Sequence, residues 1–140
     1  MKNIIIIALL CLGITTTTQA QKATSTPAAE KAFQQKFAGA TEVKWEMEKK
    51  NEYEVNFTMK GKKGSANFSG TGEWLETEMA ITSAETPKAV SDAFAKAFSG
   101  ATIKEVYKIE TKEAKNYFEI EYTLKGKTKE AKIDPSGKIM

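Results

Sequence analysis

The chain has 140 residues, 21 lysines and 18 acidic residues, for a formal net charge of +3. It contains no arginine, no histidine and one cysteine, which excludes the commonest general base and the bidentate anion clamp. A balanced, interspersed charge without arginine is not typical of a nucleic-acid-binding protein, which concentrates positive charge on one face.

The first twenty residues predict a secretory signal peptide. Residues 4–12 form an apolar run too short to span a bilayer, and Ala20 is a small residue at the expected cleavage point. Cys11 raises the alternative of a lipoprotein anchor, but Leu10 stands where that processing needs a small residue. We expect an exported protein, periplasmic or secreted, that loses its only cysteine with the signal peptide.

A helix is predicted next, within the segment TPAAEKAFQQKFAGAT. Thr26 is placed as its N-cap and Pro27 as its first residue. Phe33 and Phe37 stand four apart, which gives the helix one apolar stripe. Beyond it, alternation of apolar and polar residues predicts a strand with its apolar positions at Val43, Trp45 and Met47.

Two further strands follow around a Lys-Gly-Lys turn. In residues 52–60, Tyr53, Val55, Phe57 and Met59 alternate with polar residues, which is typical of a half-buried strand. The turn at residues 60–62 leads to another strand, and a second glycine turn at residues 71–73 leads to a fourth.

The same order then recurs. TPKAVSDAFAKAFSGAT predicts a second helix with Thr86 as its N-cap, and FEIEYTLKGKT matches the earlier YEVNFTMKGKK. In the strand between them, Tyr107 and Ile109 are expected on the apolar side. A final short strand is expected at Ile139 and Met140.

These elements predict an α+β fold made of two tandem helix-plus-four-strand repeats, residues 27–82 and 87–140. We expect one antiparallel sheet of about eight strands with both helices packed on one face. Residues 21–26 would be a linker and residues 27–140 a single domain. The alternative is two independent small domains, but residues 82–86 form a short connection with little linker character.

The repeated order of TP-helix, F-x-G-A-T, alternating strand, K-G-K and glycine turn resembles the β-lactamase-inhibitor-like, PepSY-like proteins of Bacteroidetes. The resemblance covers Pro27 to Met140. It implies an exported protein whose open, concave sheet face grips a partner. It carries over no catalytic or cofactor-binding residue. The chain departs from the inhibitor at the first hairpin, where Lys49-Lys50-Asn51 replaces a carboxylate, and its predicted open face lacks aromatic anchors.

We therefore predict no catalytic residue, no cofactor and no metal site. The candidate partner-binding face consists of polar strand residues expected to share one side of the sheet: Lys44, Glu46, Glu54, Asn56, Glu119, Glu121 and Lys132. Paired glutamates such as Glu119 and Glu121 could act as acid and base, but a solvated face balanced by lysines explains them better. Trp45 and Trp74 are expected in the core, and the hairpin lysines as soluble turn residues.

The expected function is that of an exported, non-enzymatic binding module. Its target would be an unknown protein, a peptide or an envelope glycan; we expect neither a nucleic-acid partner nor a membrane span. The alternative is inhibition of an exported enzyme, either a protease or a β-lactamase. The sequence predicts no oligomeric state.

Overall fold

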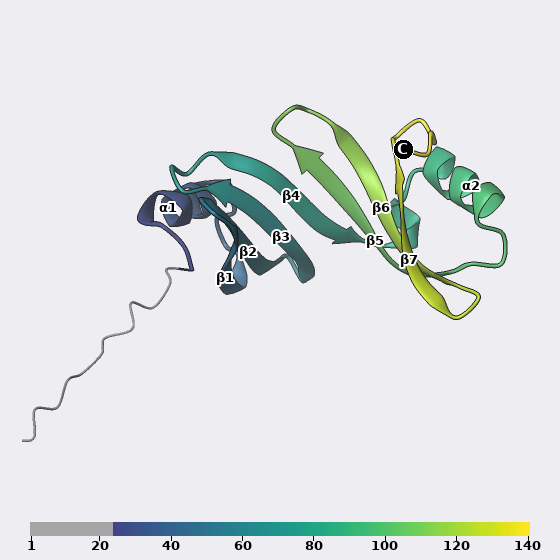
Figure 1. Ribbon diagram of the computed structural model, residues 1–140, viewed down its shortest axis with the longest axis horizontal. Coiled ribbons are helices and arrows are strands. Elements are labelled where there is room, and N and C mark those ends of the chain that lie inside the picture. Colours follow the sequence, from purple (N-terminus) through teal and green to yellow (C-terminus); the bar gives the residue numbers. More distant parts are fainter. Residues whose placement is uncertain (1–23) are drawn as a thin grey trace, which may run out of the picture.

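The computed structural model describes residues 24–140, so the predicted signal peptide and its cleavage point at Ala20 lie outside the described residues. Two α-helices and seven strands follow one another along the chain (Figure 1). Their bounds are α1 Pro27–Lys36, β1 Thr41–Lys49, β2 Glu52–Met59, β3 Lys62–Ser69, β4 Trp74–Ile81, α2 Lys88–Ala97, β5 Thr102–Thr111, β6 Asn116–Leu124 and β7 Lys127–Ile133. A short 3-10 helix, η1 Ser83–Glu85, connects β4 to α2.

All seven strands form one antiparallel sheet in chain order, with β1 and β7 at its edges. The fold is therefore α+β, as predicted. The expected eighth strand is not confirmed, because the C-terminal residues form only a single bridge, between Ile133 and Ile139. Next to this bridge, the Met140 amide donates to the Lys132 carbonyl oxygen at 2.9 Å.

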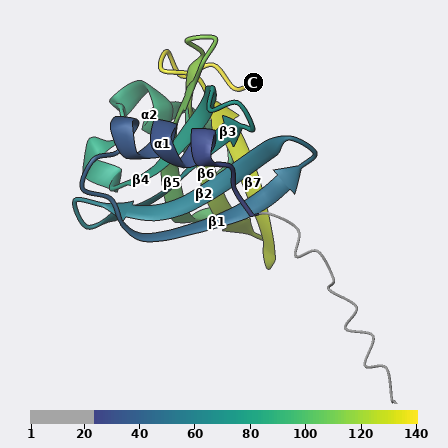
Figure 2. The same cartoon turned by 90° about the vertical axis from the view of Figure 1, so that its left-hand side faces the viewer.

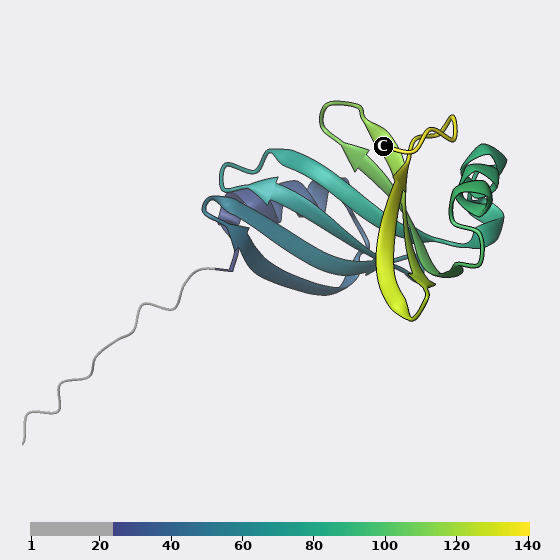
Figure 3. The same cartoon turned by 45° about the vertical axis from the view of Figure 1, so that its right-hand side comes forward.

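Both helices lie on the same face of the sheet, at opposite ends (Figures 2 and 3). One row of opposed residues crosses from β2 to β7 and shows this directly: Phe57, Gly64, Met79, Lys108, Phe118 and Ile133. Phe57 packs in the cluster under α1, and Phe118 and Ile133 pack in the cluster under α2. Because opposed residues share a face of the sheet, the other face carries no helix.

Each helix has its own buried cluster. Under α1, Phe33 is buried against Val55, Phe57, Ala66 and Phe68. Under α2, the buried residues are Val90, Phe94, Val106, Phe118, Ile120, Tyr122, Ala131 and Ile133. Burying each large apolar side chain contributes about 1.5–3 kcal/mol, so these two clusters hold the helices on the sheet.

The two helices begin differently, which corrects one prediction. Thr26 caps α1 as expected, and its hydroxyl oxygen accepts a hydrogen bond from the Ala29 amide at 3.2 Å. Thr86 was predicted to cap α2, and this is wrong: α2 begins at Lys88 with Pro87 as its N-cap. The Thr86 hydroxyl instead donates to the Thr82 carbonyl oxygen at 3.1 Å, because residues 82–86 close the η1 turn.

Two glycines lie directly against the helices. Gly72, in the turn between β3 and β4, has φ +85°, and a Cβ built there would lie 2.7 Å from the Ala28 carbonyl oxygen of α1. Gly137, in the turn after β7, has φ +90°, and its Cβ would lie 2.7 Å from the Ala89 carbonyl oxygen of α2. Glycine therefore lets each turn contact the first turn of its helix.

Candidate binding face

We call the side of the sheet opposite α1 and α2 the open face. A second row of opposed residues crosses this face: Lys44, Asn56, Ser65, Glu78, Ile109 and Tyr117. Glu46 lies opposite Glu54, and Glu119 lies opposite Lys132. Since side chains alternate between faces, Glu121 shares the face of Glu119. All seven predicted candidate residues therefore lie on the open face, four at the β1–β2 end and three on β6 and β7.

The open face is strongly acidic. By register it carries nine glutamates, namely Glu46, Glu52, Glu54, Glu76, Glu78, Glu105, Glu119, Glu121 and Glu130. Its lysines are Lys44, Lys49, Lys63 and Lys132, and Lys104 reaches it from an irregular position in β5. This distribution is opposite in sign to the whole chain, which is net positive.

Ion pairs and amide contacts offset part of this charge. The Lys132 ammonium lies 3.1 Å from Glu119 Oε2, and the Lys104 ammonium lies 3.4 Å from Glu121 Oε1. The Asn56 side-chain amide donates to Glu46 Oε1 at 3.2 Å. These contacts hold the glutamates near both ends of the sheet in fixed positions.

The three central carboxylates differ from their neighbours. In residues 24–140, Glu54, Glu76 and Glu78 have no lysine ammonium within 4.0 Å. Burial raises the pKa of all three, and for Glu78 burial together with Glu119, Glu76 and Glu54 raises the pKa to about 7. Desolvation and like charge both disfavour the ionised form, so these carboxylates would gain from a cation placed beside them.

The open face also carries aromatic residues that the sequence did not place there. Tyr107 and Ile109 were predicted on the apolar side of β5, and this is wrong: Tyr107 lies opposite Ala80 and Glu119, and Ile109 lies opposite Glu78 and Tyr117. Val106 is the β5 residue that packs under α2. Ile109 is nevertheless buried, with 1% of its surface exposed.

A local irregularity explains this error. The register shifts between Thr41 and Lys44 in β1 and between Ile103 and Glu105 in β5. An extra residue at such a bulge moves every later side chain to the other face. Counting from Gly-Ala-Thr in both halves aligns Val106 with Trp45, and this signal in the sequence would have identified the inward residue.

The remaining sequence candidates lie elsewhere. Lys60 and Gly61, like Lys125 and Gly126, have positive φ and form the tips of the β2–β3 and β6–β7 hairpins. Positive φ at both central residues matches the twist of the flanking strands, so these are tight hairpin turns, as predicted. Trp45 and Trp74 pack against the cluster under α1 rather than on the open face. The Trp74 indole N–H donates to the Thr77 hydroxyl at 2.8 Å.

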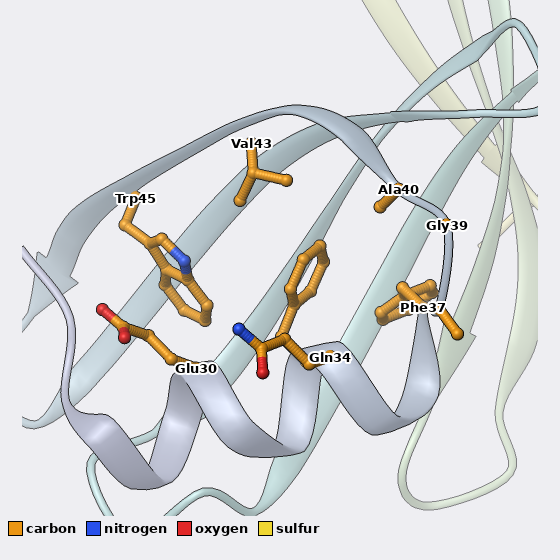
Figure 4. A pocket seen from close by; sticks show the side chains of 9 residues that line it. Glu30, Gln34, Phe37, Gly39, Ala40, Val43 and Trp45 are labelled. Carbon is orange, nitrogen blue, oxygen red and sulfur yellow. The ribbon is translucent and has the colours of Figure 1, made fainter.

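A groove between α1 and the edge strand β1 is a second candidate binding site (Figure 4). Its volume is about 460 Å³, with Val43 and Trp45 on the strand side and Glu30, Gln34 and Phe37 on the helix side. Val43 is 44% exposed. Glu30 is the one titratable side chain among its lining residues, so the groove brings together no pair of groups that could perform acid–base chemistry.

The described part of the chain contains no group of three or more Cys, Asp or Glu side chains that could hold a metal ion. Within residues 24–140, no helix is long and apolar enough to cross a membrane. Five cavities lined by these residues each include one acidic side chain: Glu30, Glu105, Asp134, Glu110 or Glu42. None of the five therefore combines two carboxylates.

Comparison with protein families identifies the class to which this fold and face belong. The profile of the family described as "Putative beta-lactamase-inhibitor-like, PepSY-like" matches residues 51–140, which run from the start of β2 to the last residue. The chain belongs to this family. No curated protein matches it.

Solved structures from Bacteroides share the fold. A "putative periplasmic" protein of Bacteroides eggerthii has a TM-score of 0.77 and 21% identity, covering 84% of this chain and 87% of its own. A DUF2874 family protein of Bacteroides uniformis has a TM-score of 0.75 and 22% identity, covering 83% and 86%. A BLIP-like protein of Bacteroides fragilis has a TM-score of 0.71 and 22% identity, covering 85% of each chain.

Proposed function

We propose that this protein is an exported, non-enzymatic binding module that holds a partner on its open face. The observation that carries the proposal is the position of α1 and α2, which both cover one side of the sheet and leave a polar side of seven strands accessible. Lys44, Glu46, Glu54 and Asn56 would contact the partner at one end, and Glu119, Glu121 and Lys132 at the other. An accessible sheet face of this kind presents many side chains in fixed rows.

The proposed location is the periplasm or the medium outside the cell. It is supported by the signal-peptide pattern of residues 1–20 and by the description of the Bacteroides eggerthii neighbour as periplasmic. Intact-mass measurement of the protein recovered from a Bacteroidetes host envelope tests this. We expect a chain that begins at Gln21; a chain retaining residues 1–20 would contradict export by cleavage.

We further propose that residues 27–82 and 87–140 are two copies of one unit. Three matched details support this: the register shifts in β1 and β5, the inward positions of Trp45 and Val106, and the glycine turns that contact α1 and α2. Within residues 24–140 the units differ at the edge of the sheet: β4 is a full strand, whereas Ile139 forms a single bridge to Ile133.

Affinity capture tests the binding proposal. The protein from Gln21 onward is immobilised and exposed to envelope extract, next to a variant with Glu54→Lys, Glu119→Lys and Glu121→Lys. A matched control reverses three exposed acids that lie in turns or on α2: Glu73→Lys, Asp92→Lys and Glu113→Lys. We expect a partner held by the native protein and the control and lost by the open-face variant. Equal retention by all three proteins would contradict the proposal.

The alternative function is inhibition of an exported enzyme, either a protease or a β-lactamase. One observation favours it: Tyr107 and Tyr117 lie on the open face, where aromatic side chains could anchor a partner. A panel of envelope hydrolases is assayed with excess protein. Inhibition that Tyr107→Ala and Tyr117→Ala abolish would establish this alternative, and no inhibition at micromolar protein would exclude it for the enzymes tested.

A further inference from the structure

The charge of the open face restricts the chemistry of what can bind there. The face carries nine glutamates but only four lysines and the approaching Lys104, although the chain as a whole has a net charge of +3. Positive charge is therefore concentrated on the helices, turns and edges, and negative charge on this one face. Such a field attracts cations and repels anionic surfaces such as nucleic acids and acidic lipids.

One lysine of this face is held by both a carboxylate and an aromatic ring. The Lys132 ammonium lies 3.1 Å from Glu119 Oε2 and 5.3 Å from the centroid of the Tyr117 ring. A carboxylate and an aromatic ring thus hold the same cation, by ion pairing and by cation–π attraction. This arrangement shows how the open face can receive a lysine side chain.

A similar combination lies two strands away without such a lysine. Glu78, on β4, is a diagonal neighbour of Tyr107, on β5, because Glu78 lies opposite Ile109 and Tyr107 lies opposite Ala80. Glu76 lies two residues along the same strand, and Glu54 lies on β2 beyond Asn67. In residues 24–140, no lysine ammonium lies within 4.0 Å of these three carboxylates.

We propose that the open face binds a basic polypeptide segment, whose lysine or arginine side chains pair with Glu54, Glu76 and Glu78. Their aliphatic stems would lie against Tyr107, as long cationic side chains commonly do on apolar surface. This inference rests on the proposed function and selects, from protein, peptide and glycan, a cationic protein segment. A neutral glycan would gain little from unpaired carboxylates and would leave them desolvated.

The probe is a fluorescent peptide of alternating lysine and serine, measured by anisotropy against the protein from Gln21 onward. A peptide with glutamate in place of lysine is the probe control. We compare the native protein with Glu54→Gln/Glu76→Gln/Glu78→Gln and with the matched surface variant Glu73→Gln/Asp92→Asn/Glu113→Gln. All variants are first checked by circular dichroism.

We expect the lysine peptide to bind the native protein, and to bind Glu54→Gln/Glu76→Gln/Glu78→Gln at least about tenfold more weakly. Binding to the native protein should weaken when the salt concentration is raised from low ionic strength to about 0.15 M. The surface variant should retain affinity within about twofold, since its acids are exposed and lie in turns or on α2. Equal weakening by both variants, binding of the glutamate peptide, or no binding to the native protein would overturn the inference.

The capture experiment separates this inference from the proposed function. If the native protein holds a partner that the lysine peptide displaces, both the proposed binding function and the basic partner are supported. Another outcome is that the charge-reversed variant Glu54→Lys/Glu119→Lys/Glu121→Lys loses the captured partner while the lysine peptide neither binds the native protein nor displaces that partner. In that case the proposed binding module stands and a basic partner is excluded. If capture shows no difference between the open-face variant and its control, the proposed function itself fails.

Discussion

Replacing Gly72 by alanine tests how closely the sheet and α1 are joined. Gly72 has φ +85°, and an added Cβ would lie 2.7 Å from the Ala28 carbonyl oxygen and 3.4 Å from the Ala28 Cβ. The left-handed backbone costs a non-glycine residue about 1–2 kcal/mol. Forcing helix and turn apart adds the cost of overpacking, about 1–3 kcal/mol. We therefore expect Gly72→Ala to lower the free energy of unfolding by about 2–5 kcal/mol.

Gly61→Ala is the matched control. Gly61 has φ +77°, and nothing lies within 4 Å of its added Cβ, so only the backbone cost of about 1–2 kcal/mol applies. Urea unfolding of the protein from Gln21 onward, followed by circular dichroism, gives the free energy of unfolding for each variant. Equal losses for Gly72→Ala and Gly61→Ala would refute the argument, because the close approach to α1 would then contribute nothing. Gly137→Ala, against Ala89 of α2, should behave like Gly72→Ala.

Three further predictions concern the core and two carboxylates. Phe94→Ala, which removes a buried ring packed against Phe98 and Tyr122, should cost about 3–5 kcal/mol in urea unfolding, whereas exposed Lys96→Ala should change little. Burial and neighbouring glutamates raise the pKa of Glu78 to about 7, so the folded state binds its proton more tightly than the unfolded state and Glu78 costs stability as pH rises from 4.5 to 7. Glu78→Gln should therefore raise the urea midpoint more at pH 8 than at pH 4.5, and a pH-independent difference would contradict this. Hydrogen bonds from Lys62 and Thr82 lower the pKa of Glu85 to about 2. Glu85→Gln should therefore lower the free energy of unfolding at pH 7, by an amount that declines as pH falls from 4.5 to 2. A loss of stability that stays constant over that range would exclude this cause.

The period of the apolar residues predicts most of the fold correctly. Thr26 and Pro27 mark the start of α1, and alternation from Tyr53 to Met59 gives the inward side of β2. The errors fall where local geometry departs from regular periodicity. The register shift between Ile103 and Glu105 reverses the faces of Tyr107 and Ile109. No alternation pattern predicts such a shift from one strand alone.

The sequence predicts which side of the sheet the candidate residues share, but not which of them pair across strands. Period two is sufficient to place Glu54 and Glu119 on one side of the sheet, as found. Which glutamates are neutralised depends on cross-strand register: Glu119 lies opposite Lys132, whereas Glu78 lies between Ser65 and Ile109. Register joins residues far apart in the chain, so the unpaired carboxylates become visible only in the assembled sheet.

The separation of the two buried clusters has a mechanical consequence. Between α1 and α2, the helix-side residues of β4 and β5 include Thr77, Met79, Lys108 and Glu110, which line a cavity of about 240 Å³ rather than a continuous core. The part of the sheet under α1 and the part under α2 are therefore joined there mainly by backbone hydrogen bonds between β4 and β5. The twist between two strands varies more easily than the packing of a close-packed core. The curvature of the opposite surface can thus be adjusted by substitutions behind the sheet, without altering a single side chain that a partner would touch.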